Sequence, residues 1–354
     1  MESRTRMTET PGTRPRRVEI LETLRGLAAL AVAWHHITSN DAFRWLNLME
    51  LGGLGVPIFF CISGFILPYA MHTGGFRWPQ DGRCFILKRV LRLDPPYLAT
   101  ILLCLAAEYA ATQAPGYQGR AFRYSAGDLL GHIAYMNSLW GCKWVNPVFW
   151  TLAIEFQYYL FVACLFPLLV LRHPLSRTLA LAGMLASSPC FGFHYVFHHL
   201  PLFVIGIASF QRYCGISSRL EWSCVVLISA VVGGYVSGIP DALAAVGCTL
   251  TIVLWPATAV PPGALQYLGR ISYSLYLVHF PIGCRLRNIG ARVVGDSAPG
   301  QVVVALVSLA VSVLVAHGMW RLIEKPSQAW ASRLRYGSVP EPTVNSAITE
   351  PPVC

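Results

Sequence analysis

Hydrophobic residues fall in ten runs along the chain, separated by shorter segments that hold most of the charged residues. Of the 354 residues 55% are hydrophobic and only 12% are charged, whereas soluble domains carry about 25% charged residues. The pattern predicts an all-α polytopic membrane helical bundle with about ten transmembrane helices. The predicted spans are 24–39, 52–70, 96–112, 149–171, 178–193, 200–211, 221–237, 242–259, 265–283 and 302–323.

The polar segments set the expected domain limits and topology. Residues 1–20 form a basic tail, residues 21–325 the membrane domain, and residues 326–354 a second tail that is expected to be largely disordered. Ten spans place both termini on one side, and the positive-inside rule predicts that this side is the cytoplasm, for a multi-pass protein of the cell membrane. Seven of the 27 Lys and Arg residues fall in the predicted outer segments: Arg44, Arg120, Arg123, Lys143, Arg285, Arg287 and Arg292. The cluster of Arg285, Arg287 and Arg292 runs against the rule.

Charge and cysteine content exclude several classes of protein. The net charge of +10 does not indicate nucleic-acid binding, because the basic residues lie between apolar spans and not along one stripe. The eleven cysteines include no CxxC pair, and the histidines of the sequence HYVFHH have no acidic ligand beside them. We therefore expect no nucleic-acid partner, no metal and no permanently bound cofactor.

The first span carries Arg25 and His36, eleven residues apart. At about 100° per residue the two side chains lie on one helix face, about 16 Å apart along the axis, and His35 points about 80° away. Ionisable residues inside a membrane helix are candidates for function, so a stripe lining a cavity is one interpretation. An interfacial arginine and a packing histidine form the alternative.

A basic segment precedes the third span. On a helix, Lys88, Arg89 and Arg92 lie near one face. Guanidinium groups match phosphate oxygens in bidentate hydrogen bonds, so this face could recognise a phosphate. Attraction of the same charges to anionic lipid is the alternative.

Three later segments carry further polar candidates. Glu155 enters the fourth span, where a carboxylate must be protonated, paired or in a wet cavity, or must form an ion pair that locks helices. In the ninth span Ser272, Tyr276 and His279 follow one stripe at helical spacing. Glu324 comes just before a proline that is expected to end the last helix near the inner surface. For these later groups a structural role is equally compatible with the pattern.

Six blocks of sequence occur in a fixed order: LRGLAALAVAWHH, GVPIFFCISGF, ILKRVLRLDPPY, FWTLAIEFQYYLF, LGRISYSLYLVH and RLIEKP. With these blocks the chain resembles the membrane-bound acyltransferase-3 family, of the O-antigen and exopolysaccharide O-acyltransferase type, over nearly its whole length. The resemblance implies about ten helices. It also implies transfer of an acyl group, often acetyl, from a coenzyme A thioester to an acceptor hydroxyl.

The family's marked positions fall on residues of this chain. They are its Arg and His pair (Arg25, His36), its inner arginines (Arg89, Arg92), its Trp and Glu (Trp150, Glu155), its SGF turn (Ser63, Gly64) and its late Glu (Glu324). The chain departs from the family at Pro57, where an acid is common, at Phe156, where a second acid is common, and at Asp94, which replaces the usual Tyr. No hydrolase domain is expected after the last span.

The resemblance and the residues together predict an integral membrane O-acyltransferase. It would move an acyl group, by expectation acetyl, from acyl-CoA as co-substrate to a hydroxyl of a carbohydrate or of a secondary-metabolite acceptor. His36, as a neutral imidazole, would act as general base or would first accept the acyl group. Arg25 would position coenzyme A or a cavity carboxylate, and Glu155 or Glu324 would orient the imidazole.

The arginines Arg89 and Arg92, with Lys88, would hold the phosphates of the acyl-CoA, and membrane lipid would surround the bundle. A transporter or flippase of a sugar or lipid-linked substrate with the same charged cavity is the alternative function. Such a protein would move its substrate without releasing coenzyme A. A scaffolding membrane protein is a third interpretation, for which the Arg25 and His36 stripe has no purpose.

Overall fold

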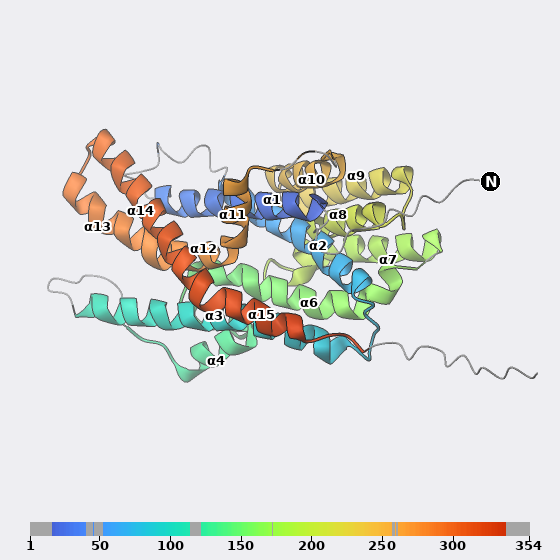
Figure 1. Ribbon diagram of the computed structural model, residues 1–354, viewed down its shortest axis with the longest axis horizontal. Coiled ribbons are helices and arrows are strands. Elements are labelled where there is room, and N and C mark those ends of the chain that lie inside the picture. The colour runs from blue at the N-terminus through green and yellow to red at the C-terminus, as the bar shows by residue number, and fades with distance from the viewer. Residues whose placement is uncertain are drawn as a thin grey trace, which may run out of the picture.

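The computed structural model describes residues 16–39, 45, 52–113, 122–171, 173–256, 259 and 261–337, and within these residues the regular structure is helical, with no strand. The longer helices run largely along the long axis of the molecule (Figure 1). They are α1 (Arg16–Thr38), α2 (Gly55–Thr73), α3 (Gly82–Thr112), α6 (Trp150–Leu169), α7 (Pro174–Ser187), α8 (Val196–Tyr213), α9 (Arg219–Val236), α10 (Ile239–Leu254) and α14 (Ala298–Met319). The shorter helices are α4 (Ala126–Ala134), α5 (Asn137–Trp140), α11 (Gly263–Arg270), α12 (Ser272–Val278), α13 (Arg285–Val294) and α15 (Lys325–Arg333).

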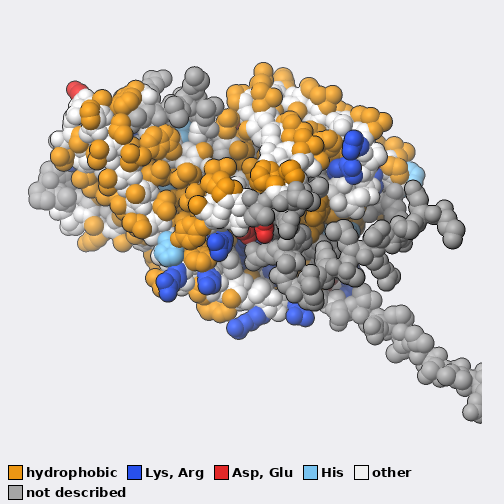
Figure 2. All heavy atoms as spheres, turned by 45° about the horizontal axis from the view of Figure 1, so that its top comes forward, with side chains coloured by type: hydrophobic (Ala, Val, Ile, Leu, Met, Phe, Trp, Pro, Cys, Tyr) orange, Lys and Arg blue, Asp and Glu red, His pale blue; other side chains and the backbone are white. Residues whose placement is uncertain are grey.

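Each predicted span falls wholly or mainly on helix, which confirms the all-α membrane bundle. Five helical segments of the described chain are long and apolar enough to cross a membrane: Gly52–Thr73, Gly82–Thr112, Pro147–Leu169, Arg219–Val236 and Ala298–Arg333. The other predicted spans fall on helices that are shorter or more polar. The face in Figure 2 is mostly hydrophobic, with Lys and Arg gathered in a few groups, as expected of a surface that faces lipid.

Glycine lets helices touch through their backbones at several crossings. A Cβ atom on Gly64 of α2 would lie 2.1 Å from the carbonyl oxygen of Phe203 in α8, and one on Gly206 of α8 would lie 2.0 Å from that of Cys61. Helices α1 and α11 meet in the same way, since a Cβ atom on Gly269 would lie 2.0 Å from the Glu22 carbonyl oxygen. Small residues at crossings are the usual means of close packing in membrane bundles.

Ser63 and Gly64, assigned to a turn by the resemblance, instead lie in the middle of α2. Gly64 contributes the close approach to α8, because no side chain fits between the two backbones there. Its role is thus in packing, and only Ser63 of this pair has a polar group to offer.

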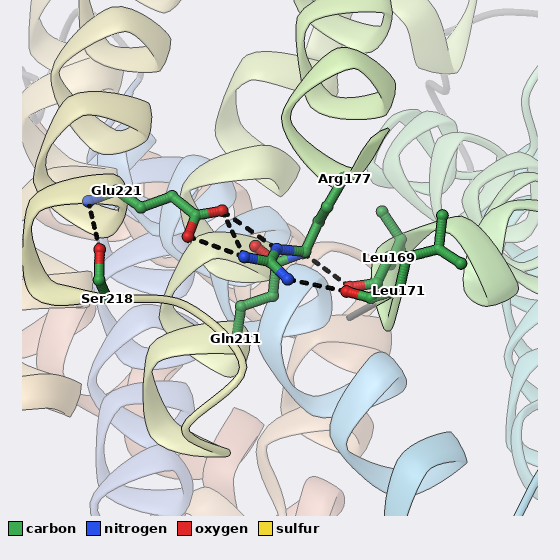
Figure 3. Close-up of polar contacts among 6 residues, drawn as sticks. All are labelled: Leu169, Leu171, Arg177, Gln211, Ser218 and Glu221. Atoms are coloured by element: carbon green, nitrogen blue, oxygen red, sulfur yellow. Dashed lines mark hydrogen bonds and ion pairs between the residues drawn. The ribbon is translucent and has the colours of Figure 1, made fainter. Parts of the chain in front are cut away.

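A buried ion pair joins the ends of several helices (Figure 3). The Arg177 guanidinium of α7, only 2% exposed, donates to Glu221 of α9 at 2.6 and 2.7 Å from Nη2 and at 3.1 Å from Nε. Arg177 Nη1 donates to the carbonyl of Leu171, just after α6, at 2.8 Å. From α8, Gln211 donates to the carbonyl of Leu169 at 2.8 Å. These bonds bring the end of α6, the start of α7, the end of α8 and the start of α9 to one end of the bundle.

A small platform of α4, α5 and the turn Pro147–Phe149 follows α3 and precedes α6 along the chain. Asp128 accepts hydrogen bonds from the backbone amides of Ser125 at 2.8 Å and Lys143 at 2.7 Å, and these bonds lower its pKa to about 2. Burial lowers the pKa of His132 to about 4, so its Nε2 stays free to accept from the Val145 amide at 3.1 Å. The Tyr97 hydroxyl, from α3, contacts His132 Nδ1 at 3.0 Å and fixes the platform to that helix.

Two helices contain a π-helical segment, His279–Cys284 between α12 and α13 and Trp320–Glu324 between α14 and α15. Pro281 lies in the first segment and lacks a backbone N–H, which prevents a regular α-helical hydrogen bond there. Such segments are rare and often occur at functional sites. Both of them carry a candidate residue of the sequence analysis, His279 in the first and Glu324 in the second.

The predicted tails begin differently in the structure. Helix α1 starts at Arg16, before the expected boundary at residue 20, and α15 continues through Pro326, which the first turn of a helix accommodates. After α15, Tyr336 packs on Phe76 with ring centroids 5.4 Å apart, and the Gly337 amide donates to Asp81 at 2.9 Å. Residues 326–337 are therefore ordered against α2 and α3, and the remainder of the expected tail, 338–354, lies outside the described residues.

The crossing of α2 and α8 predicts the effect of one added methyl group. We expect Gly64→Ala to lower the unfolding free energy by about 1–3 kcal/mol, because the new Cβ must push the two backbones apart. Thermal unfolding in detergent measures this. The matched control is Gly247→Ala in α10, where a Cβ meets no atom within 4 Å. Equal stability of the two variants would contradict a tight crossing at Gly64.

Candidate functional site

Helix α1 carries Arg25 towards its start and His36 near its end. The separation of eleven residues corresponds to about 16 Å along the axis. Arg25 lines two adjoining cavities, whereas His36 lines neither and contacts His279. The two residues of the predicted stripe therefore lie in different surroundings. Arg25 lies at a basic cavity, and His36 lies in a pair of imidazoles.

The larger cavity, of about 630 Å³, lies among the first turns of α1, the start of α3, α11 and α15. Its charged lining consists of six cations and two carboxylates: Arg25, Lys88, Arg89, Arg92, Arg270, Lys325, Glu22 and Glu324. The three cations predicted on one face of α3 are therefore brought together, and α1, α11 and α15 add three more. An excess of positive charge in a cavity favours a ligand with several negative charges.

Arg89 has a donor atom that the protein leaves without an acceptor. Its Nε is buried and has no hydrogen-bond partner among the described residues. The guanidinium carbon lies 5.2 Å from the ring centre of Phe85 and 5.8 Å from that of Tyr159, which holds the group in place. A buried donor without an acceptor is costly, so a ligand oxygen or water at this point would lower the free energy.

A smaller cavity, of about 140 Å³, adjoins the basic one along Arg25, Arg89 and Arg92. Most of its other walls are apolar: Val56, Phe59, Phe60, Ile62, Ile66, Leu67, Ala70, Leu93 and Leu152. Its lining also includes Thr151 and Tyr276, whose hydroxyl oxygens are 2.6 Å apart. The two cavities together resemble a charged vestibule that narrows into an apolar passage.

Glu155 lies on the wall of the smaller cavity and accepts a hydrogen bond from the Ser63 hydroxyl at 2.8 Å. This bond links α6 to α2 and accounts for one oxygen of the carboxylate. Trp150, one turn and a half earlier on α6, packs on Phe193 with ring centroids 4.5 Å apart and lines neither of the two cavities. Of the predicted Trp and Glu pair, only the Glu reaches the cavity.

Glu324 is buried on the wall of the basic cavity. It accepts from the Ser274 hydroxyl at 2.6 Å and backbone amide at 3.2 Å, and from Gln328 at 2.9 Å. Its carboxylate interacts electrostatically with Arg25 and Arg92, and so offsets part of their charge. The expectation that a proline ends the helix directly after Glu324 is wrong, because the π segment continues into α15.

His36 and His279 form a pair of imidazoles near the end of α1. His279 Nε2 lies 3.3 Å from His36 Nδ1, and the ring centroids are 5.1 Å apart. His36 Nδ1 also lies 3.0 Å from the carbonyl oxygen of Val32, one turn back on the same helix. His279 is fully buried and packs on Tyr276, with ring centroids 5.7 Å apart, so the pair lies next to the wall of the smaller cavity.

The group beside His36 differs from the one that the sequence analysis expected. Neither Glu155 nor Glu324 has His36 among its hydrogen-bond partners in the described chain, and His279 takes the place predicted for a carboxylate. Arg270 and Lys325 of the basic cavity were not predicted at all. Both lie inside the blocks LGRISYSLYLVH and RLIEKP, and their position directly before or after an apolar run was the available signal.

The family model described as an acyltransferase domain matches residues 18–317, which contain every site residue named above except Glu324 and Lys325. The chain belongs to the acyltransferase-3 family. This membrane protein is therefore an acyltransferase with several transmembrane helices.

Relatives of this acyltransferase share about a quarter of its residues. Acyltransferase MdmB of Streptomyces mycarofaciens is 25% identical over 94% of this chain and 98% of that protein. A putative acetyltransferase, ORF330 of Acidianus two-tailed virus, is 26% identical over 72% of this chain and 80% of its own length. O-acetyltransferase OatA of Staphylococcus aureus is 26% identical over 88% of this chain and 57% of that protein. No solved structure matches the chain.

Proposed function

We propose that this acyltransferase takes an acetyl group from acetyl-CoA and transfers it to a hydroxyl of a carbohydrate or glycosylated acceptor. The observation that carries the proposal is the arrangement along α1, with a basic cavity at Arg25 and an imidazole at His36. The names of two relatives support acetyl as the acyl group, and that of OatA supports an oxygen acceptor. The carbohydrate nature of the acceptor rests on the family resemblance.

The chemistry of the basic cavity fits coenzyme A. That molecule carries a diphosphate and a further phosphate, and the cavity offers six cations against two carboxylates. Arg89 adds a buried Nε–H that lacks an acceptor, which a phosphate oxygen would supply. Arg25 and Arg92 lie on the boundary with the smaller cavity and would hold the phosphate nearest to the pantetheine arm.

The length of that arm fits the distance along α1. About twelve bonds join the phosphate oxygen of coenzyme A to its sulfur, and an extended chain spans about 3.3–3.6 Å per three bonds, which makes roughly 14 Å. The separation of Arg25 from His36 along the helix is about 16 Å. A phosphate held at Arg25 therefore places the thioester near His36, provided that the arm passes Phe59 and Tyr276 on the wall of the smaller cavity.

His36 supplies the base. In the proposed reaction, His36 Nε2 takes the proton of the acceptor hydroxyl while its oxygen forms a bond to the thioester carbonyl carbon. The carbon–sulfur bond then breaks, and the proton passes from the imidazolium to the leaving thiolate, so that free coenzyme A and the acetyl ester result. The same lone pair would attack the thioester directly in a route through an acetyl-imidazole, which the acceptor hydroxyl then opens.

The two ends of α1 give the donor and acceptor separate approaches. The basic cavity lies at the end of the bundle where the described chain begins and ends, and the positive-inside rule assigns this end to the cytoplasm. Acetyl-CoA is a cytoplasmic metabolite, so the donor would enter there. The acceptor would reach His36 from the opposite side of the membrane.

We expect His36→Ala to abolish acetyl transfer, because His36 Nε2 is the group that takes the acceptor proton in the proposed reaction. The measurement is incorporation of labelled acetyl from acetyl-CoA into acceptor in membranes of the producing cells. His35→Ala is the matched control and should keep activity within about threefold, since the His35 ring only packs edge-on against His36, with ring centroids 5.4 Å apart, and lies about 100° around the helix from it. Loss of transfer in the His35 variant alone, with activity intact in the His36 variant, would overturn the assignment.

We expect Arg89→Gln to raise the KM for acetyl-CoA by about 10- to 100-fold with little change in kcat, because a lost charged hydrogen bond to the phosphates weakens ground state and transition state alike. Arg83→Gln is the control, since Arg83 is exposed on the same helix and lines no part of the cavity. The same assay measures release of free coenzyme A. Substrate transport without this release would support the transporter alternative and contradict the proposal.

A further inference from the structure

The hydrogen bonds around His36 identify which nitrogen carries its proton. A carbonyl oxygen can only accept, so His36 Nδ1, at 3.0 Å from the Val32 oxygen, must be the protonated nitrogen. In a neutral imidazole this leaves Nε2 with the free lone pair. The tautomer of the proposed base is thus set by the backbone of its own helix.

The same reasoning applies to His279. Its Nδ1 lies 3.2 Å from the carbonyl oxygen of Leu275 and must also carry the proton. His279 Nε2 then has a lone pair, and it lies 3.3 Å from His36 Nδ1. His36 Nδ1–H therefore donates to two acceptors, the Val32 carbonyl oxygen and His279 Nε2. The four groups make one chain of hydrogen bonds with a single consistent set of protons.

From this geometry we infer that His279 is a positioning residue for the transfer reaction, whose Nε2 lone pair stabilises the positive charge that His36 acquires in the transition state. The inference rests on the proposed role of His36. When His36 Nε2 takes the acceptor proton, its ring becomes an imidazolium. Its Nδ1–H is then a charged donor, and hydrogen bonds of charged donors are about twice as strong as neutral ones. The route through an acetyl-imidazole places the same charge on the ring.

The surroundings hold the His279 imidazole in one orientation. Its side chain is fully buried, its Nδ1 is bound to Leu275, and its ring packs on Tyr276, which is itself bound to Val148 at 3.0 Å and Thr151 at 2.6 Å. The π segment that begins at His279 contributes by breaking the α-helical register at Pro281. A group fixed in advance stabilises charge without the cost of reorienting during the reaction.

A neutral partner also suits the place. A second full charge beside His36 would need compensation in a buried site, and the two candidate carboxylates are already bound, Glu155 by Ser63 and Glu324 by Ser274 and Gln328. An imidazole provides an acceptor without adding a charge. His279 therefore fulfils the orienting function for which a carboxylate was expected, at a smaller desolvation cost.

Two substitutions of His279 by side chains of similar size distinguish a role in positioning His36 from a role in packing alone. His279→Gln keeps an acceptor in the form of a side-chain carbonyl oxygen, whereas His279→Met fills the space with only a weak acceptor. We expect His279→Met to lower kcat by about 10- to 100-fold with an unchanged KM for acetyl-CoA, because the lost bond strengthens only in the transition state. The glutamine variant should recover most of this loss. Labelled acetyl transfer in isolated membranes gives both constants.

His199→Met is the matched control for losing a buried histidine. His199 Nε2 contacts the Phe193 carbonyl oxygen at 3.0 Å and His199 is 3% exposed, but its side chain lines neither cavity and reaches the smaller one only through the back of Phe60, at 5.2 Å between ring centroids. His199→Met should lower the thermal unfolding temperature but leave kcat equal to that of the unaltered enzyme. If the methionine and glutamine variants of His279 have equal kcat, whether lowered or not, the inference is wrong. Activity in His36→Ala would refute the proposed function itself, whereas an inactive His36→Ala with a fully active His279→Met would refute only the inference.

Discussion

Positive charge inside an apolar bundle is the constraint on which the rest of this structure depends. The guanidinium groups of Arg25, Arg89 and Arg92 share the boundary between two cavities, in a molecule whose visible outer face is mostly hydrophobic (Figure 2). Buried charges are costly unless they are paired or in water. Glu324 offsets part of the charge, but six cations face only two carboxylates in the larger cavity. This excess of positive charge favours an anion in the cavity, whereas Arg177 and Glu221 form a paired contact that locks helices.

The close helix crossings give the site its geometry. Helix α1 touches α11 through Gly26 and Gly269, which brings the start of α1 beside Arg270 and the cavity. Helix α2 touches α8 through Gly64 and Gly206, and this leaves Ser63 one residue away to bind Glu155. Because the backbones are in contact, these helices cannot slide without a clash, so the packing fixes which groups of the neighbouring helices face Arg25 and His36.

Helical spacing predicted part of this site from the sequence. The spacing of Arg25 and His36 gives the angle between the two side chains around the helix and their distance along its axis. Both values are independent of the neighbouring helices. Which surroundings each group meets depends on residues far along the chain, such as Leu275 and His279, and no local pattern contains that information. The expected stripe of Ser272, Tyr276 and His279 shows the same limit, since two of its members line the smaller cavity while the third, in the π segment, faces His36.

Polar residues near the ends of spans were the least predictable. A proline after Glu324 was expected to end the helix, but Pro326 lies in the first turn of α15, where its missing N–H costs nothing. The short tail that follows packs through Tyr336, whose contacts with Phe76 and Lys88 are again long-range. Propensities and charge counts predict a helix and the side of the membrane on which its ends lie, whereas contacts between segments arise only in the assembled bundle.

In the proposed reaction one helix holds the phosphates of the donor at Arg25 and meets its thioester at His36. The most direct measurement compares acetyl-CoA with acetyl-pantetheine, which lacks every phosphate, as donors for the unaltered enzyme and for Arg89→Gln. We expect loss of the phosphates to lower kcat/KM at least about 100-fold in the unaltered enzyme and much less in the variant, where a phosphate contact is already absent. Equal use of both donors by the unaltered enzyme, or the same loss in both proteins, would contradict it.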